Sequence, residues 1–236
     1  MISDGEVLYM TSDADMRAAI GRYRDRGFRT MVSLDVVTAT ADGEIAPATP
    51  LPTDSEFIKL LLDEVGELAA LAEAEDVDLY GALNEPDVRL GEAARAFAGQ
   101  QLAISQAHFW GPIIWKGGAD TSIVVEGYDI VGGSLGAPDD ANADQIRHDT
   151  RITLDGMRAQ AASSGVDSLM VTEFGLWHGD FSTWSDERKS VLYEEVFDYA
   201  PDLDGYFVFD GPEGYDMPLA DSPGEAVVTN WYLNGL

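Results

Sequence analysis

The sequence predicts an α/β fold built around a largely parallel sheet. Amphipathic segments of helical periodicity alternate with short β-rich runs along most of the 236 residues. The β-rich runs are apolar on both faces, as in a parallel sheet that is covered by helices. Most of them recur at the spacing of a strand, a helix and their loops. Two architectures fit this pattern, an open doubly wound sheet and a (β/α)8 barrel.

Local signals place the elements of this alternation. Ser12, with Asp15 three residues later, starts a helix that Gly27 ends, and Thr53 with Glu56 forms a capping box for the next helix. Prolines and small polar residues predict a loop before that second helix. The predicted elements are a helix over 12–26, a strand over 28–37, a loop over 38–52, a helix over 54–75, a strand over 77–83, a helix over 90–108, strands over 112–116 and 128–133, a helix over 141–163, a strand over 167–172, a helix over 185–199, a strand over 205–209 and a closing helix over 226–233.

Six strands are clear in this pattern, and residues 7–10 would make a seventh. Neither an internal repeat nor a linker divides the chain, so we expect one domain over residues 1–236.

Charge excludes several classes of partner. The chain has 43 acidic and 14 basic side chains and a formal net charge of −29, spread along its length. Such a chain repels nucleic acid and anionic membranes. Dispersed acid with only three lysines is also typical of a protein kept soluble at very high salt, where screening removes self-repulsion. We therefore expect a halophilic protein that binds neither nucleic acid nor membranes.

Other patterns are missing from the sequence. There is no cysteine, so thiolate chemistry and Cys-based zinc sites are excluded. The three histidines have no metal-ligand spacing, and no glycine-rich phosphate motif follows the first strand, so we expect no metal and no cofactor. No stretch is long and apolar enough to span a membrane, and no signal peptide is visible. The location therefore stays open between the cytoplasm and secretion by a leader upstream of the sequence.

Two carboxylates stand out from the acidic background. Glu85 and Glu173 each come directly after an apolar strand, in the segments LYGALNEPD and SLMVTEFGLW. The carboxyl ends of parallel strands carry the active sites of α/β folds. A protonated carboxyl and an ionised one can there cleave a glycosidic bond, with retention at a separation of about 5–5.5 Å and inversion at about 6.5–9.5 Å.

The segments Asn84-Glu85-Pro86 and Thr172-Glu173-Phe174-Gly175 resemble the two signatures of the clan A glycoside hydrolases. This resemblance implies a (β/α)8 barrel with Glu85, after strand four, as acid/base and Glu173, after strand seven, as nucleophile. It implies that Asn84 binds the sugar 2-hydroxyl. The substrate would be a β-linked oligo- or polysaccharide, and within the clan the chain is most similar to the β-mannanase-type branch.

Aromatic and polar residues near the strand ends are candidates for sugar contacts. Indole rings stack on sugar C–H faces, so Trp177 and Trp115 are candidates, although core packing explains Trp115 equally well. His178, Phe209 and Asp210 also lie near predicted strand ends. His108, His148 and Tyr128 are interpreted as structural residues.

The chain departs from the clan in three respects. No segment matches the arginine near the end of strand two, and the predicted sixth strand ends in Gly132-Gly133-Ser134-Leu135 without the expected tyrosine. Six or seven strands instead of eight predict an N-terminally incomplete barrel, whose sheet edges need cover. Two alternatives follow: a carbohydrate-binding or structural barrel with an impaired site, and an unrelated aldolase or metal-dependent hydrolase. Against the aldolase, Lys116 is the one lysine near a predicted strand end.

Overall fold

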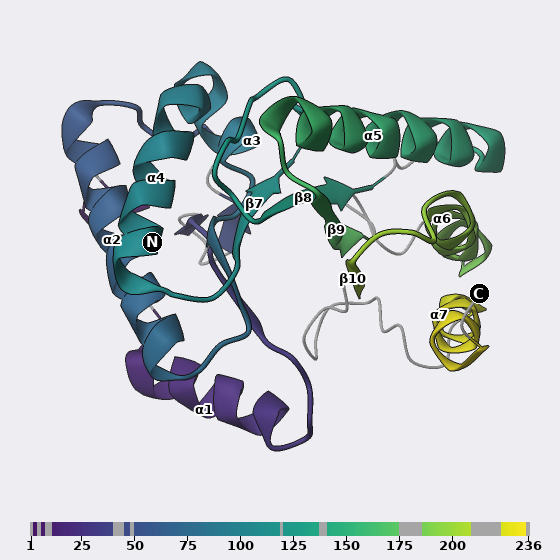
Figure 1. Ribbon diagram of the computed structural model, residues 1–236, viewed down its shortest axis with the longest axis horizontal. Helices are drawn as coiled ribbons and strands as arrows, with labels where there is room; N and C mark the ends of the chain where they lie inside the picture. Colours follow the sequence, from purple (N-terminus) through teal and green to yellow (C-terminus); the bar gives the residue numbers. More distant parts are fainter. Residues whose placement is uncertain are drawn as a thin grey trace. The chain divides into compact units, whose positions relative to one another are not determined.

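The computed structural model describes residues 2–3, 6–7, 11–39, 45–47, 50–118, 120–136, 141–174, 186–208 and 223–234 (Figure 1). The helices in these ranges are α1 (Asp13–Arg24), α2 (Ser55–Ala74), α3 (Pro86–Leu90), α4 (Ala94–His108), α5 (Ala143–Ser164), α6 (Asp186–Tyr199) and α7 (Pro223–Asn234), with a 3-10 turn at Gly91–Ala93. The strands are β1 (Ile2–Ser3), β2 (Glu6–Val7), β3 (Met31–Leu34), β4 (Val37–Ala39), β5 (Ile45–Pro47), β6 (Leu79–Leu83), β7 (Ile113–Gly117), β8 (Ile130–Leu135), β9 (Ser168–Phe174) and β10 (Gly205–Val208).

Strand order distinguishes between the two predicted architectures. Six strands form one sheet in the order β10-β9-β8-β7-β6-β3, and the two short hairpins β1-β2 and β4-β5 are antiparallel. The pairs β3–β6, β6–β7 and β9–β10 are parallel. A doubly wound sheet reverses its strand order at a switch point, whereas here each strand lies beside the next one in the sequence. The described part of the chain is therefore a partial (β/α)8 barrel, as predicted.

Contacts group the chain into two compact units. The first contains residues 1–131 and 160–167, and the second contains residues 132–159 and 168–236. Strand β8 and helix α5 each contribute residues to both units. The prediction of a single catalytic domain stays a prediction.

In the first unit, helices α2 and α4 lie side by side (Figure 1). Helix α2 buries an apolar stripe that includes Leu61, Val65 and Ala69. The buried Tyr80 of β6 donates its hydroxyl to the carbonyl of Val65 at 2.7 Å, which ties the sheet to the helix. Burial raises the pKa of Tyr80, so its hydroxyl remains a donor.

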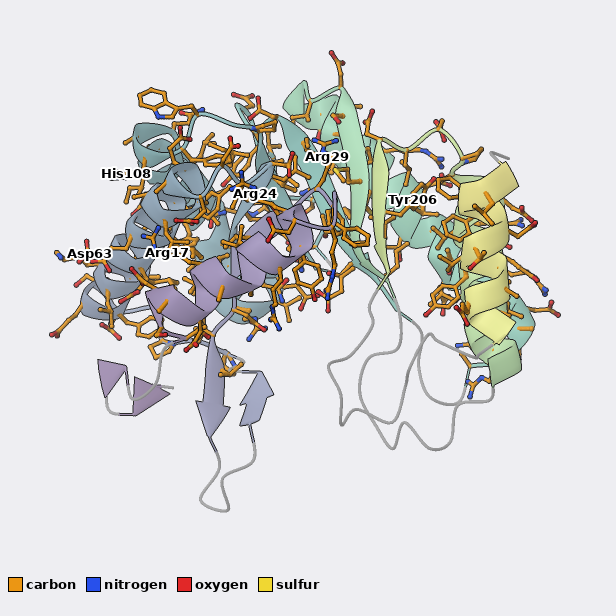
Figure 2. All side chains as sticks on the ribbon, turned by 90° about the horizontal axis from the view of Figure 1, so that it is seen from below. Arg17, Arg24, Arg29, Asp63, His108 and Tyr206 are labelled. Atoms are coloured by element: carbon orange, nitrogen blue, oxygen red, sulfur yellow. The ribbon has the colours of Figure 1, made fainter. Side chains whose placement is uncertain are left out.

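Helix α1 is attached to the end of α2 largely by charge. Its arginines Arg17 and Arg24 bind Glu75 and Asp76, and Figure 2 shows both arginines extending from α1. Only Ile20 of α1 is buried. Ion pairs that are this exposed stabilise by about 0–1 kcal/mol each, so we expect α1 to be among the less stable elements.

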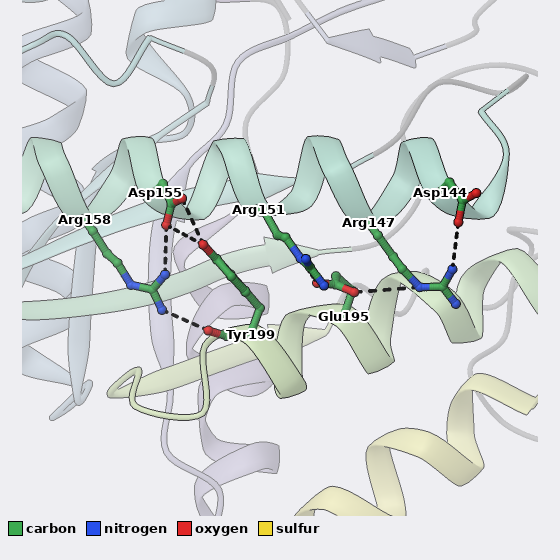
Figure 3. Close-up of polar contacts among 7 residues, drawn as sticks. All are labelled: Asp144, Arg147, Arg151, Asp155, Arg158, Glu195 and Tyr199. Carbon is green, nitrogen blue, oxygen red and sulfur yellow. Dashed lines mark hydrogen bonds and ion pairs between the residues drawn. The ribbon is translucent and has the colours of Figure 1, made fainter.

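In the second unit, helices α5 and α6 are joined by a polar network (Figure 3). Glu195 is 5% exposed and accepts from Arg151 at 2.5 Å, with Arg147 at 3.8 Å. One turn further along α6, the hydroxyl of Tyr199 donates to Asp155 at 2.9 Å, and this hydrogen bond raises the pKa of Tyr199. Leu192, Val196 and Phe197 of α6 are buried.

Most predicted elements are confirmed to within a few residues, and Ser12 caps α1 as predicted. The predicted loop over 38–52 was wrong in part, because it contains strands of the β4-β5 hairpin. The cap of α2 was also misassigned. Asp54 and not Thr53 accepts the N–H groups of Glu56 and Phe57.

Candidate active site

Glu85 lies directly after β6, where the chain leaves the sheet. The N–H of Asn84 donates to the carbonyl of Leu34 in β3 at 2.8 Å, and the N–H of Glu85 donates to the carbonyl of Lys116 in β7 at 2.9 Å. Both neighbouring strands therefore hold the chain at this point. The side chain of Glu85 is partly buried at the carboxyl edge of the sheet.

The backbone at Glu85 is in a left-handed conformation, with φ 50° and ψ 54°. Among the described residues, the non-glycine residues with positive φ are Asp76 and Glu85. This conformation costs about 1–3 kcal/mol and persists where the surroundings fix it. Pro86 then starts α3 at its first position, where a missing N–H costs nothing.

The backbone that follows β7 lies close to Glu85. Buried Asp87 accepts the N–H groups of Gly118 and Asp120, both at 2.7 Å. A Cβ at Gly118 would lie 2.4 Å from Cγ2 of Val88 and 3.3 Å from Cβ of Glu85. Only glycine lets this backbone approach the carboxylate so closely, and Asp87 holds it there.

A buried arginine fastens α3 to the end of β3. Arg89 donates from Nη1 to the carbonyl of Val36 at 2.7 Å and from Nη2 to Asp35 at 2.5 Å. Its side chain is 3% exposed, whereas that of Asp35 is 47% exposed. The N–H of Arg89 also donates to the carbonyl of Glu85 at 3.0 Å. The short helix that follows Glu85 is therefore fixed at both ends.

Lys116 binds the side chain next to Glu85. Its ammonium donates to Oδ1 of Asn84, and Lys116 is 6% exposed. A Cβ built on Gly81 would lie 3.5 Å from Oγ of Ser33 and 3.7 Å from Cβ of Lys116, so these residues share one face of the sheet. Tyr80 precedes Gly81 and reaches α2 on the other face. Lys116 therefore points away from the helices, toward the inner face.

Glu173 belongs to the second unit and is the next-to-last residue of β9. Its side chain is partly buried, and Thr172 before it is 3% exposed. Val171 pairs with Tyr206 and Phe174 with Val208, so β9 carries one more residue than β10 across this interval. Such a bulge re-aims the side chains at its position.

Strand β6 shows the same feature. Ser33 pairs with Gly81 and Leu34 with Leu83, which leaves Ala82 as the extra residue two positions before Asn84. Bulges are enriched next to active sites because they redirect side chains at the end of a strand. Both β6, which precedes Glu85, and β9, which contains Glu173, thus have a bulge near the carboxyl end.

Trp115 is not on the face that the sugar-contact hypothesis requires. It is fully buried, and its ring meets that of Tyr128 edge-on at 5.8 Å. Tyr128 donates to the carbonyl of Ala98 in α4 at 2.8 Å, which places Trp115 on the helix-facing side of β7. The reason is strand alternation, because Lys116 takes the inward position one residue later. Core packing, the alternative weighed for Trp115, explains its position.

The other predicted sugar contacts, Trp177, His178, Phe209 and Asp210, lie outside the described residues. Tyr128 packs in the core as predicted, and burial raises its pKa. His108 packs against α2, because its ring carbon Cδ2 lies 3.6 Å from the position that a Cβ on Gly66 would take. Figure 2 labels His108 beside the helices of the first unit.

Two kinds of feature are not found in the described ranges. No group of three or more His, Asp or Glu residues there could hold a metal ion. None of the helices within these ranges has the length and apolar character needed to cross a membrane.

The sequence reasoning missed the residues that support Glu85. Lys116 was considered only as an aldolase lysine, and Asp87 and Arg89 were not singled out. Asp87 and Arg89 follow Glu85 within four positions, and this closeness to the motif is the sequence signal that could have identified them. For Lys116 the signal was that lysine is rare in this chain, which has three, and that one of the three stands at a predicted strand end.

Neither a model of a known protein family nor a curated protein matches the sequence. Solved structures do match its fold. The GH113 β-mannanase from Alicyclobacillus acidocaldarius, solved in complex with ManMIm, has a TM-score of 0.71 at 16% identity, over 97% of this chain and 82% of that one.

Two further structures extend the likeness. The endo-β-1,4-mannanase from Thermotoga petrophila has a TM-score of 0.66 at 10% identity, over 98% of this chain and 63% of that one. The endo-β-1,4-glucanase from Xanthomonas axonopodis pv. citri has a TM-score of 0.62 at 13% identity, over 97% and 82%. The chain therefore shares the (β/α)8 barrel fold of these structures, and identities this low show the fold alone.

Proposed function

We propose that this protein is a retaining glycoside hydrolase that acts on β-linked oligo- or polysaccharides. Glu173 is the nucleophile and Glu85 the acid/base. β-1,4-Mannan is the first substrate to test, because the similar structures include β-1,4-mannanases. Fold alone does not establish an activity, so the proposal depends on the residues at the strand ends.

One observation carries the proposal. In a fold shared with these glycosidases, Glu85 and Glu173 both stand at the carboxyl ends of strands, each just after or within a bulge. Asn84 precedes Glu85, as the clan signature requires. The hydrogen bonds of Asn84, Asp87 and Arg89 hold the Glu85 turn in a costly left-handed conformation, which is the pre-organisation that catalysis needs.

The reaction runs in two steps. Protonated Glu85 donates its proton to the glycosidic oxygen while the carboxylate of Glu173 attacks the anomeric carbon, and the bond to the leaving alcohol breaks. Ionised Glu85 then takes a proton from water, whose oxygen attacks the same carbon and releases Glu173. Both steps invert the anomeric carbon, so the product keeps the β configuration.

One observation favours the alternative of an impaired carbohydrate-binding barrel. Strand β8 ends in Gly133-Ser134-Leu135, without the tyrosine of the clan. A Cβ at Gly133 would lie 2.6 Å from the sulfur of Met157 in α5, so a larger residue there would require the Met157 side chain to move. Sugar binding by calorimetry without turnover would favour this alternative.

The test uses an activated aryl β-mannoside and an aryl β-glucoside, at high and at low salt. Wild type should release the phenol, fastest in high salt. Glu173→Ala and Glu85→Ala should each lose activity by several orders of magnitude. Glu92→Ala removes an exposed glutamate from the turn after α3 and serves as the matched control.

Azide then separates the two roles. In Glu173→Ala, azide attacks the substrate directly and yields the α-glycosyl azide. In Glu85→Ala, azide attacks the glycosyl-enzyme and yields the β-glycosyl azide, because no general base is needed. The same anomer from both variants, or no rescue of either, would contradict the assignment.

A further inference from the structure

We propose that Lys116 is a positioning residue that fixes the orientation of the Asn84 amide toward the substrate. This inference rests on the proposed function and adds to it a residue that the clan signatures do not include. Asn84 directly follows β6, and Lys116 lies in β7, the parallel strand beside β6 in the same unit.

The ammonium determines which way the amide faces. Lys116 can only donate hydrogen bonds, and it donates to Oδ1 of Asn84. If the amide were flipped, its NH₂ group would face the ammonium, donor against donor. The contact therefore turns the NH₂ group of Asn84 away from Lys116, where it can donate to a sugar hydroxyl.

Burial strengthens this preference. Lys116 is 6% exposed, so little water screens the contact or competes for the ammonium. The positive charge of Lys116, held beside Oδ1 of Asn84, also polarises the amide and makes its N–H groups stronger donors. An aliphatic side chain of similar length would fill the same space without either effect.

Backbone hydrogen bonds connect this pair to the acid/base. The carbonyl of Lys116 accepts from the N–H of Glu85, and the side chain of Lys116 binds Asn84. One residue thus sets both the strand position that holds Glu85 and the amide orientation beside it. A substitution of the side chain alone leaves the backbone contact to Glu85 in place, so the two contributions can be separated.

The experiment compares two substrates that differ at one hydroxyl. Wild type, Lys116→Met, Lys116→Arg and Asn84→Ala are assayed on an aryl β-mannoside and on its 2-deoxy analogue, after subtraction of the uncatalysed rate. Gln101→Met is the matched control. It removes a buried donor from the same unit, but its partner is Tyr128 on the helix-facing side.

On the mannoside, Lys116→Met should lower kcat roughly tenfold to a hundredfold with KM changed less than about threefold, because the contact strengthens in the transition state. On the 2-deoxy substrate the same variant should lose less than about threefold. Lys116→Arg should recover much of the loss, and Lys116→Met should add little to Asn84→Ala. Gln101→Met should lower the melting temperature without changing the ratio between the substrates.

The outcomes separate the two proposals. Without wild-type turnover of any β-glycoside, the proposed function fails and this inference fails with it. With wild-type turnover, an equal loss on both substrates, or additive losses in the Lys116→Met/Asn84→Ala variant, would overturn the role of Lys116 and leave the proposed function standing.

Discussion

The close approach of Gly118 to α3 predicts a measurable effect on catalysis. A Cβ at this position would lie 2.4 Å from Cγ2 of Val88 and 3.3 Å from Cβ of Glu85. The first distance is about 1 Å short of ordinary van der Waals contact between carbon atoms. Gly118→Ala therefore requires the Val88 side chain to move, and with the tight contact to Cβ of Glu85 we expect it to shift α3 and Glu85 away from the loop after β7.

The expected costs follow from that displacement. Overpacking of this kind destabilises by about 1–3 kcal/mol. A misplacement of about 1 Å in a catalytic group lowers the rate by roughly a hundredfold, so kcat should fall by about this factor under conditions in which the variant is still folded. Urea unfolding and steady-state kinetics on the aryl β-mannoside measure the two effects separately.

A second substitution tests the cause. Val88→Ala removes the methyl group that the new Cβ would meet, and Val88 is 40% exposed, so this change alone should cost less than about 1 kcal/mol. The double variant Val88→Ala/Gly118→Ala should regain most of the lost kcat. A double variant no faster than Gly118→Ala, or a fully active Gly118→Ala, would refute the reasoning.

Two further predictions concern stability. Arg89→Met removes a charge-assisted bond to the carbonyl of Val36 and an ion pair with the half-exposed Asp35, so urea unfolding should show a loss of about 2–4 kcal/mol; a loss below about 1 kcal/mol would contradict this. Burial first, and then the charges of Glu67 and Asp63, raise the pKa of Glu64 above 4.5. Folding disfavours the charged form of Glu64, so the protein is more stable below the unfolded-state pKa of this group and loses that stability as the pH rises through the folded-state pKa. Glu64→Gln removes the charge and should therefore stabilise the protein at pH 7 by about 0.2–0.5 kcal/mol. That gain should shrink below pH 4.5 and in high salt, and a gain that is constant with pH would count against it.

The alternation of helices and strands could be predicted because it depends on local patterns. Helix α2 buries Leu61, Val65 and Ala69 at helical spacing, and Gly27 ends α1 with a φ of 82°. The β4-β5 hairpin was missed because its strands have three residues each, although Asp42-Gly43 between them is a hairpin signal.

The candidate glutamates were recognised by their motifs, whereas side-chain direction was not predictable. Trp115 and Lys116 are adjacent, and a shift of one residue in the alternation exchanges the helix-facing and inner positions. The sequence indicates that a strand ends near residue 116 but does not specify which of its residues face the helices and which face inward. The contacts of Asp87 and Arg89 join segments 31 and 54 positions apart, and no local pattern reports such pairs.

Labelling of the nucleophile is the most direct measurement of the central claim. An activated 2-deoxy-2-fluoro-β-glycoside should lose its leaving group as the carboxylate of Glu173 forms an ester with the anomeric carbon. The fluorine slows hydrolysis of this ester, so mass spectrometry of the digested protein can locate it. The account predicts one label per chain on the peptide that contains Glu173, and none in Glu173→Ala. No label on a folded wild-type protein that binds the compound, or a label on another residue, would contradict it.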